Sequence, residues 1–216
     1  MRVIYLHGFA SSATSSKATF FKAKLTARGT PVAIPDLNEP DFGTLTVTRM
    51  LREVTGAIDG GSGPVALMGA SLGAFVAVQA ALARPALVDR LVLLAPALDA
   101  DRLRDLAPGG LDAWKATNAL NVFHYGYGRT IPVHYELYAD ARLYDCVAAD
   151  LAMPVQVFQG RRDRAVDPEF VEGWSRTRPN VELHMLDDDH QLLGSLEHIW
   201  REVESFLFRP AYQQIP

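Results

Sequence analysis

The stretch VALMGASLGAFVAVQAALA, from Val65 to Ala83, decides the fold. It begins with Val65–Met68, an unbroken apolar run that is typical of a strand buried on both faces of a parallel sheet. It ends with Leu72–Ala83, a run of small and apolar residues long enough for a helix. Between these parts, the glycines of Gly69–Gly73 indicate a tight turn from strand to helix, which is one unit of a βαβ fold.

The rest of the chain repeats this order of short apolar run and longer helical pattern. The runs show little alternation, which favours a parallel sheet covered by helices on both faces. We therefore predict an α/β fold with a doubly wound, mostly parallel sheet of six strands. The expected strands are Val3–Leu6, Val32–Pro35, Val65–Met68, Leu91–Ala95, Val155–Phe158 and Val181–Leu186, and the expected helices include Lys17–Arg28, Leu45–Ile58 and Leu72–Ala83.

Residues 99–150 interrupt this rhythm. The segment is longer than an ordinary connection, and such segments often form lids or binding loops. No Gly/Ser run, charge block or low-complexity tract separates two domains along the 216 residues. We therefore predict a single domain over residues 1–216, with residues 99–150 as a lid-like insertion.

The composition excludes several classes of protein. The net charge is −4, and the 21 basic and 25 acidic residues are spread along the sequence without the basic stripe of a nucleic-acid binder. Cys146 is the only cysteine, and it lacks the Cys/His spacing of a zinc site. The apolar run Val3–Leu6 is too short for a signal-peptide core, and no stretch reaches membrane-spanning length. We expect a cytoplasmic protein that binds neither nucleic acid nor membrane and holds no metal.

Gly69-Ala70-Ser71-Leu72-Gly73 matches the G-x-S-x-G pattern of a nucleophile elbow. The pattern alone is a weak signal, but a buried strand before it and a helix after it are the context that the elbow requires. There the serine hydroxyl projects from a strained turn, and the glycines avoid collisions with neighbouring backbone. A serine that only caps the helix is the alternative. As a nucleophile, Ser71 needs an acid and a histidine that follow it in that order.

Two carboxylates compete for the role of the acid after the strand Val155–Phe158. Asp167 precedes Pro168 at the start of a helical pattern, so helix capping accounts for it. Asp163 lies in the loop itself and has no such structural explanation. We therefore favour Asp163 and keep Asp167 as the alternative.

The base should follow the last strand, and His190 does. His184 falls inside that strand, His198 lies on the final helix, and His124 and His134 precede the acid. Position in the chain thus selects His190, on a loop of the kind that often carries catalytic groups.

His7-Gly8-Phe9 follows the first strand and is the candidate oxyanion loop. A tetrahedral intermediate needs two N–H donors, and one should come from Leu72, the residue after the nucleophile. We assign the second to the backbone of Phe9. We expect Gly8 to let this loop come close and His7 to hold it by hydrogen bonds. A plain strand-to-helix turn is the alternative.

The N-terminal loop also resembles the opening of a known group, the small bacterial esterases of the YqiA-like group within the α/β-hydrolase superfamily. The resemblance rests on Tyr5-Leu6-His7-Gly8-Phe9, Ser11-Ser12 and Ser16-Lys17-Ala18, followed by the elbow, the Gly160–Asp163 segment and the Asp189-His190 pair in the superfamily's order. It implies a Ser71-Asp163-His190 triad, a carboxylester-hydrolase activity and no cofactor. It also implies that two N-terminal strands of larger members are absent.

The substrate is less well defined by the sequence. The insertion carries several aromatic residues, of which we expect Trp114, Tyr125 and Tyr127 to contact substrate, although aromatics packed under the segment would give the same pattern. We expect a hydrolase that cleaves carboxylic esters of small to medium acyl chains through an acyl-enzyme on Ser71. The same triad also serves thioesters, amides and carbon–carbon bonds, and a non-catalytic small-ligand sensor or a protein-interaction module are further alternatives.

Overall fold

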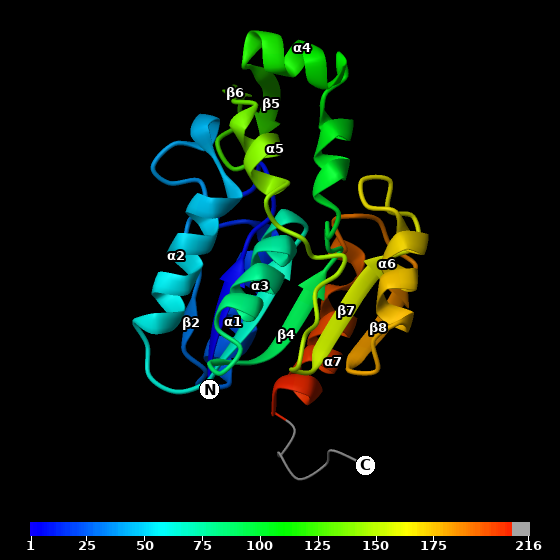
Figure 1. Cartoon of the computed structure of the whole chain (residues 1–216). Coiled ribbons are helices and arrows are strands. Elements are labelled where there is room, and N and C mark those ends of the chain that lie inside the picture. Colours follow the sequence, from blue (N-terminus) through cyan, green and yellow to red (C-terminus); the bar gives the residue numbers. More distant parts are fainter. Residues whose placement is uncertain (209–216) are drawn as a thin grey trace.

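The centre of the molecule is a six-stranded sheet in which all neighbouring strands are parallel (Figure 1). The computed structural model describes residues 1–208, so the last eight residues of the predicted domain, 209–216, lie outside the described residues. The strand order is β2-β1-β3-β4-β7-β8, which reverses its direction of growth between β1 and β3. In open α/β sheets such a switch point, at the carboxyl ends of the strands, is where ligands bind.

The predicted parallel α/β sheet is confirmed, with small changes in its bounds. The strands of the sheet are β1 (Arg2–Leu6), β2 (Val32–Ala33), β3 (Val65–Ala70), β4 (Val88–Leu94), β7 (Val155–Gly160) and β8 (Val181–Leu186). The edge strand β2 is shorter than the predicted Val32–Pro35, because Pro35 has no N–H with which to extend the ladder.

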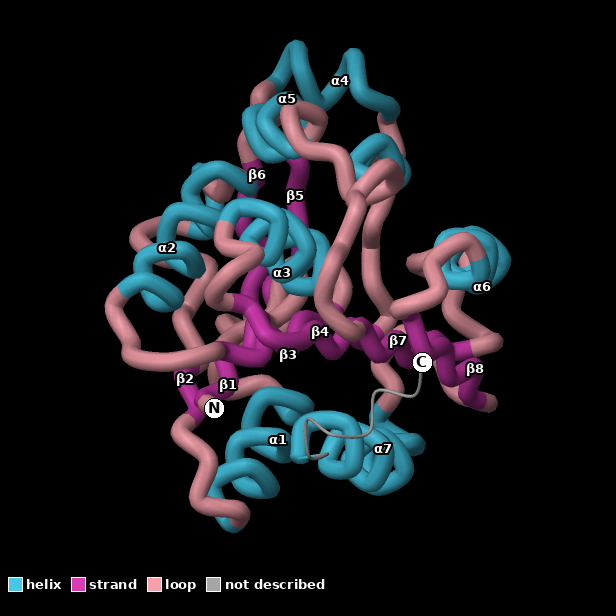
Figure 2. Tube along the Cα trace, turned by 60° about the horizontal axis from the view of Figure 1, so that its bottom comes forward, coloured by secondary structure: helices cyan, strands magenta, loops and turns pink. Residues whose placement is uncertain are grey.

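Helices cover both faces of the sheet (Figure 2). α1 (Ser16–Ala27) and α7 (Leu196–Phe208) lie on one face, where their apolar side chains pack in a cluster with Tyr5, Met68 and Phe158. α2 (Val47–Asp59), α3 (Leu72–Ala83) and α6 (Pro168–Arg176) lie on the other face. α3 has the bounds predicted for it, and its residues 72–81 are all buried, as expected for a helix that is apolar on every side.

The insertion is a small cap built on the carboxyl ends of the strands, at the top of Figure 1. It contains a 3-10 segment (Ala100–Leu106), α4 (Gly110–Thr117), the antiparallel hairpin of β5 (Leu120–His124) and β6 (Arg129–Val133), and α5 (Glu136–Ala141). This hairpin was not among the strands predicted from the sequence.

The cap is joined to the rest of the molecule by packing and by hydrogen bonds. Trp114 and Leu137 of the cap belong to the same apolar cluster as the residues of α2 and α3. The Asp140 carboxylate accepts hydrogen bonds from the backbone N–H of Thr48 at 2.8 Å and from its hydroxyl at 2.5 Å. Within residues 1–208, no helix is both long enough and apolar enough to span a bilayer.

Candidate active site

Ser71 occupies the turn between β3 and α3 in a conformation that residues with a side chain seldom adopt. Its φ is 52° and its ψ is −119°, which costs on the order of 1–3 kcal/mol. A Cβ on Gly69 would lie 2.6 Å from Ala74 Cα, and one on Gly73 would lie 2.5 Å from the carbonyl oxygen of His7. Glycine is therefore required on both sides of the turn. The Ser71 side chain makes no capping hydrogen bond to α3, which removes the helix-cap alternative.

The fold brings Ser71, Asp163 and His190 together. His190 Nδ1 lies 2.8 Å from Asp163 Oδ2, and His190 Nε2 lies 3.1 Å from Ser71 Oγ. The serine follows β3, the aspartate follows β7, and the histidine lies in the loop between β8 and α7. Because the parallel strands end at one edge of the sheet, residues 119 positions apart in the chain meet there.

The Asp163 carboxylate is fully enclosed and accepts four hydrogen bonds. Its Oδ1 accepts from the backbone N–H of Ala165 at 2.8 Å and of Val166 at 2.9 Å, and its Oδ2 accepts from Gln159 Nε2 at 2.9 Å as well as from His190. Burial raises the pKa of the Asp163 carboxyl, but the hydrogen bonds outweigh it and hold that pKa below its ordinary value. The carboxylate is therefore ionised at neutral pH.

This ionised carboxylate fixes the tautomer of His190. A carboxylate can only accept hydrogen bonds, so His190 Nδ1–H must donate to Asp163. In a neutral imidazole the other nitrogen then has a free lone pair, and His190 Nε2 presents it to the Ser71 hydroxyl.

Asp167 is a helix cap, as its position before Pro168 predicted. Its side chain accepts from the backbone N–H of Glu169 at 3.0 Å, and Pro168 is the first residue of α6. Of the two carboxylates in this loop, Asp163 alone contacts His190 within the described residues.

The loop that carries His190 is built by neighbouring polar groups. A Cβ on Gly160 would lie 2.5 Å from the carbonyl oxygen of Asp189, so glycine lets the end of β7 approach this loop. Asp188 is buried and accepts hydrogen bonds from the Ser195 hydroxyl and the Asp189 N–H, both at 2.8 Å. The three aspartates before His190 thus include one that shapes the loop.

The two expected oxyanion donors belong to residues next to the elbow: Leu72 follows Ser71 in the chain, and Phe9 follows Gly8, whose loop runs beside Ser71. Neither the Phe9 N–H nor the Leu72 N–H has a hydrogen-bond partner among residues 1–208, and both residues line the same cavity as Ser71. The first N–H groups of a helix are left without partners by its geometry, which accounts for Leu72. The ring of Phe9 packs against Phe42 at 5.3 Å between centroids, which anchors the loop.

His7 holds this loop in place, as expected from the sequence. It is buried, its Nε2 accepts from the backbone N–H of Leu37 at 3.0 Å, and its Nδ1–H donates to the carbonyl oxygen of Gly8 at 3.0 Å. A Cβ on Gly8 would lie 3.2 Å from Ser71 Cβ, so glycine allows the loop to run close to the elbow.

A cavity of about 1300 Å³ lies between the carboxyl ends of the strands and the cap, and Ser71, Asp163 and His190 line it. Its walls differ in character. The cap contributes apolar side chains that include Leu103, Leu106, Val122 and Phe123, whereas residues 11–17 contribute hydroxyl groups and Lys17.

The aromatic residues expected to contact substrate have different positions. Tyr125 lines the cavity and is largely exposed. Trp114 is buried inside the cap, where its indole N–H donates to the carbonyl oxygen of Val133 at 2.9 Å. Tyr127 stacks on His124 with ring centroids 3.9 Å apart. Neither Trp114 nor Tyr127 lines the cavity, which corrects both assignments: their rings pack within the cap.

Sequence reasoning missed two residues of the site. Gln159, the residue before the last one of β7, donates to Asp163. Lys17, on the first turn of α1, donates from Nζ to the carbonyl oxygen of Gln191 at 2.9 Å and so ties α1 to the loop of His190. Burial lowers the pKa of Lys17 to about 8, although Asp189 and other nearby carboxylates oppose that shift. The Ser16-Lys17-Ala18 motif was the available signal for Lys17.

The sheet is parallel and carries a serine elbow at its switch point. An aspartate and a histidine follow along the chain, and the histidine links the aspartate to the serine. These features define the α/β-hydrolase fold. The chain belongs to UPF0227, an uncharacterised protein family, which it matches over residues 2–207. The family and fold expected from the N-terminal loop and the elbow are thereby confirmed. The sequence has no significant match among curated proteins.

Solved structures with the same fold include esterases and lipases. Est1E from Butyrivibrio proteoclasticus with bound ferulic acid has a TM-score of 0.82 at 20% identity, over 96% of this chain and 88% of that one. Alpha/beta hydrolase domain-containing protein 10 from mouse has a TM-score of 0.78 at 19% identity, over 95% and 88%. Paleococcus ferrophilus monoacylglycerol lipase has a TM-score of 0.72 at 18% identity, over 95% and 93%.

Proposed function

We propose that this protein is a serine hydrolase that cleaves carboxylic esters of small to medium acyl chains through an acyl-enzyme on Ser71. The observation that carries the proposal is the continuous chain of hydrogen bonds from Asp163 through His190 to Ser71, at 2.8 and 3.1 Å. A serine hydroxyl at neutral pH is a poor nucleophile, and a base within hydrogen-bond reach is what activates it. Ordinary packing gives no reason for three such groups to align.

In the first half of the reaction, His190 Nε2 takes the proton of the Ser71 hydroxyl as Oγ attacks the ester carbonyl. Asp163 holds the imidazole in the required tautomer and stabilises the imidazolium that forms. The N–H groups of Phe9 and Leu72 stabilise the negative oxygen of the tetrahedral intermediate. The imidazolium then gives its proton to the leaving alcohol, and the acyl group remains on Ser71.

In the second half, His190 removes a proton from a water molecule that attacks the acyl-enzyme. The intermediate collapses, Ser71 regains its proton from the imidazolium, and the carboxylic acid leaves. No cofactor enters these steps. Losing one of the two oxyanion donors should lower kcat by a factor of about 10² to 10³.

The two-sided cavity supports an ester substrate with an apolar acyl group. The side chains of Leu103, Leu106, Val122 and Phe123 form the cap wall beside Ser71 and can bury a hydrocarbon chain. The opposite wall, over residues 11–17, offers hydroxyl groups to the more polar part of the substrate.

Hydrolysis of nitrophenyl esters of increasing chain length tests the proposal. Wild type should turn over the short and medium esters, and Ser71→Ala should reduce kcat to background. Ser62→Ala is the control, because Ser62 is an exposed serine in the turn before β3 and does not line the cavity. Equal rates in wild type and Ser71→Ala would refute the proposal. A parallel panel of thioesters, amides and β-diketones identifies which acyl donor the triad prefers, since the fold alone does not fix the substrate.

A further inference from the structure

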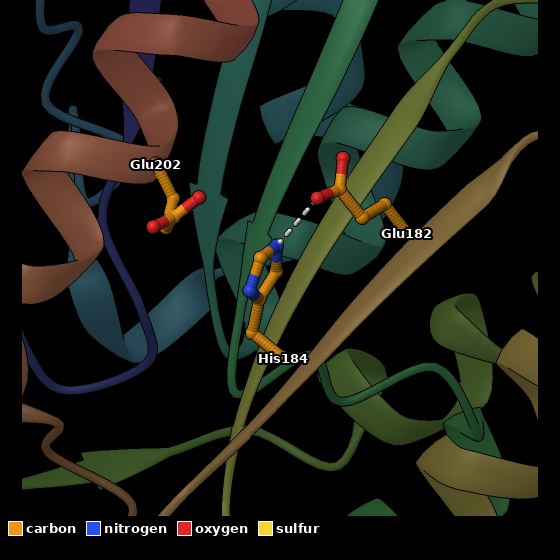
Figure 3. A group of neighbouring side chains, drawn as sticks. All are labelled: Glu182, His184 and Glu202. Carbon is orange, nitrogen blue, oxygen red and sulfur yellow. Dashed lines mark ion pairs between the residues drawn. The ribbon is translucent and has the colours of Figure 1, made fainter.

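Three potential metal ligands converge on the face of the sheet that α7 covers, away from the Ser71 cavity (Figure 3). Glu182 and His184 are two residues apart on β8, so their side chains point to the same face. Glu202 reaches the same place from α7. The cluster lies beside the first half of β8, whereas Ser71 and His190 lie at the carboxyl ends of the strands.

The donor atoms are spaced almost as metal ligands are. One ligand atom from each of the three residues lies within 4.8 Å of the others, and His184 Nε2 is 3.2 Å from Glu182 Oε1. Two ligands of one zinc ion, each about 2.1 Å from it, stand roughly 3 to 3.5 Å apart. The Glu182–His184 pair already has this spacing, and Glu202 needs a side-chain movement of less than about 2 Å.

The imidazole of His184 is held rigidly, and Glu202 is available. The ring stacks on Phe158 with centroids 4.7 Å apart and an angle of 16° between planes. Within the described part of the chain, the Glu202 carboxylate has neither a cationic partner nor a hydrogen bond. Among residues 1–208, two carboxylates therefore face one imidazole, and neither forms an ion pair with a lysine or arginine.

Gln156 gives an independent indication of a ligand. It lies on β7 directly opposite Glu182 and is fully buried. Its Nε2 is 3.1 Å from His184 Nε2, and its Oε1 has no hydrogen-bond partner among residues 1–208. A neutral imidazole nitrogen cannot both accept from the Gln156 amide and donate to Glu182. A buried amide oxygen without a partner is costly. A half-turn of the Gln156 amide would bring this oxygen to the position that Nε2 now holds, so that two oxygens, from Gln156 and Glu182, would face one imidazole nitrogen of His184. A cation placed among these three atoms would satisfy all of them.

We propose that Glu182, His184 and Glu202 bind a divalent transition-metal ion of the zinc type, with the amide oxygen of Gln156 as a further ligand after a half-turn of its amide. An imidazole with carboxylates suits Zn²⁺ or Co²⁺ and is uncommon for Mg²⁺ or Ca²⁺, which prefer oxygen ligands alone. The prediction that the protein holds no metal rested on the lack of a cysteine spacing, whereas these ligands come from two strands and a helix.

The ion would join β8, the edge strand, to α7. These two elements flank the loop that carries His190. The bound metal would therefore stabilise the packing of α7 against β8 without taking part in the reaction. The inference therefore does not depend on the proposed function. Its readout is thermal stability and metal binding, which require no substrate.

The experiment uses the full chain, treated with EDTA and dialysed, then titrated with Zn²⁺ while thermal unfolding and binding heat are recorded. With Zn²⁺ at about a hundred times its dissociation constant, Tm of the wild type should rise by roughly 5 to 10 °C, and one ion should bind per chain. His184→Gln and Glu202→Gln should lose this rise.

Two controls separate this site from other histidines. His198→Gln changes an exposed histidine on the same helix, and His190→Ala removes the histidine beside Ser71, so both variants should keep the Zn²⁺-induced rise in Tm. Because each variant is compared with and without metal, a lower baseline stability does not affect the result. A wild type whose Tm does not rise with Zn²⁺, or a His184→Gln variant that rises as much as wild type, would overturn the inference.

Discussion

Replacing Asp163 with asparagine should stop catalysis by forcing His190 into the wrong tautomer. The backbone N–H groups of Ala165 and Val166 both point at Oδ1, so an asparagine NH₂ group there would face two donors. The new side chain therefore keeps its oxygen at that position and turns its NH₂ group toward His190 Nδ1. Gln159 can adapt, because a half-turn of its amide presents an oxygen that has no partner among the described residues of the wild type.

The consequence reaches Ser71 through the imidazole. His190 must now accept a hydrogen bond at Nδ1, and its proton moves to Nε2, which lies 3.1 Å from Ser71 Oγ. A protonated Nε2 cannot take the serine proton. A wrong tautomer in a Ser-His-Asp triad lowers kcat by about 10⁴-fold, which corresponds to about 5 kcal/mol of transition-state stabilisation.

The assay is kcat and KM for nitrophenyl butyrate at pH 7, with Asp167→Asn as the matched control. Asp167 lies in the same loop but caps α6, so its replacement should cost about 1 kcal/mol of stability or less and leave kcat within a few-fold of wild type. The tautomer argument fails if Asp163→Asn keeps more than a tenth of the wild-type kcat, or if Asp167→Asn loses more kcat than Asp163→Asn does.

Three other predictions concern the turn, the half-buried Lys17 and the cap. Gly73→Ala should abolish activity and lower Tm, because its Cβ would strike carbonyl oxygens at the end of β1. Gly56→Ala, in open space within α2, should instead stabilise the protein by about 0.5–1 kcal/mol. Equal changes in Tm for the two variants would contradict this. Lys17 has a pKa of about 8 in the folded protein and an ordinary value of 10.5. Between pH 8 and 10.5, its amine therefore binds fewer protons in the folded state than in the unfolded state. Stability should therefore rise from pH 8 to 10.5 in wild type relative to Lys17→Met. Lys22 is exposed on the same helix, so the stability of Lys22→Met should change with pH as that of wild type does. A difference in stability between wild type and Lys17→Met that stays constant across this pH range would rule out the lowered pKa of Lys17. Phe123→Ala should lower kcat/KM for octanoyl esters several-fold more than for acetyl esters, and an equal loss for both would exclude the cap wall as the acyl-binding surface.

The sequence was sufficient for the sheet and for the three aligned side chains because each depends on a strong local constraint. Gly69 and Gly73 are needed by the backbone of the elbow, so the motif carries its own structure. Asp163 could be separated from Asp167 because the order Asp-Pro already explains a helix cap. His190 could be chosen because parallel strands bring their carboxyl ends to one edge.

The cap and its contacts could not be predicted in the same way. Its hairpin has only short alternating runs, and the direction of each aromatic ring depends on tertiary packing. Trp114 thus packs in the cap core, whereas Tyr125, another aromatic residue of the insertion, lines the cavity. Lys17 reaches the carbonyl of Gln191 across 174 residues, and no local pattern encodes such a contact.

The most direct test of the account is labelling with a fluorophosphonate probe, followed by intact-mass and peptide mass spectrometry. We expect one adduct per chain, located on Ser71, absent in Ser71→Ala and formed far more slowly in His190→Ala. An adduct on another residue, no adduct at all, or an equal labelling rate in His190→Ala would contradict the claim that His190 activates Ser71 as a nucleophile.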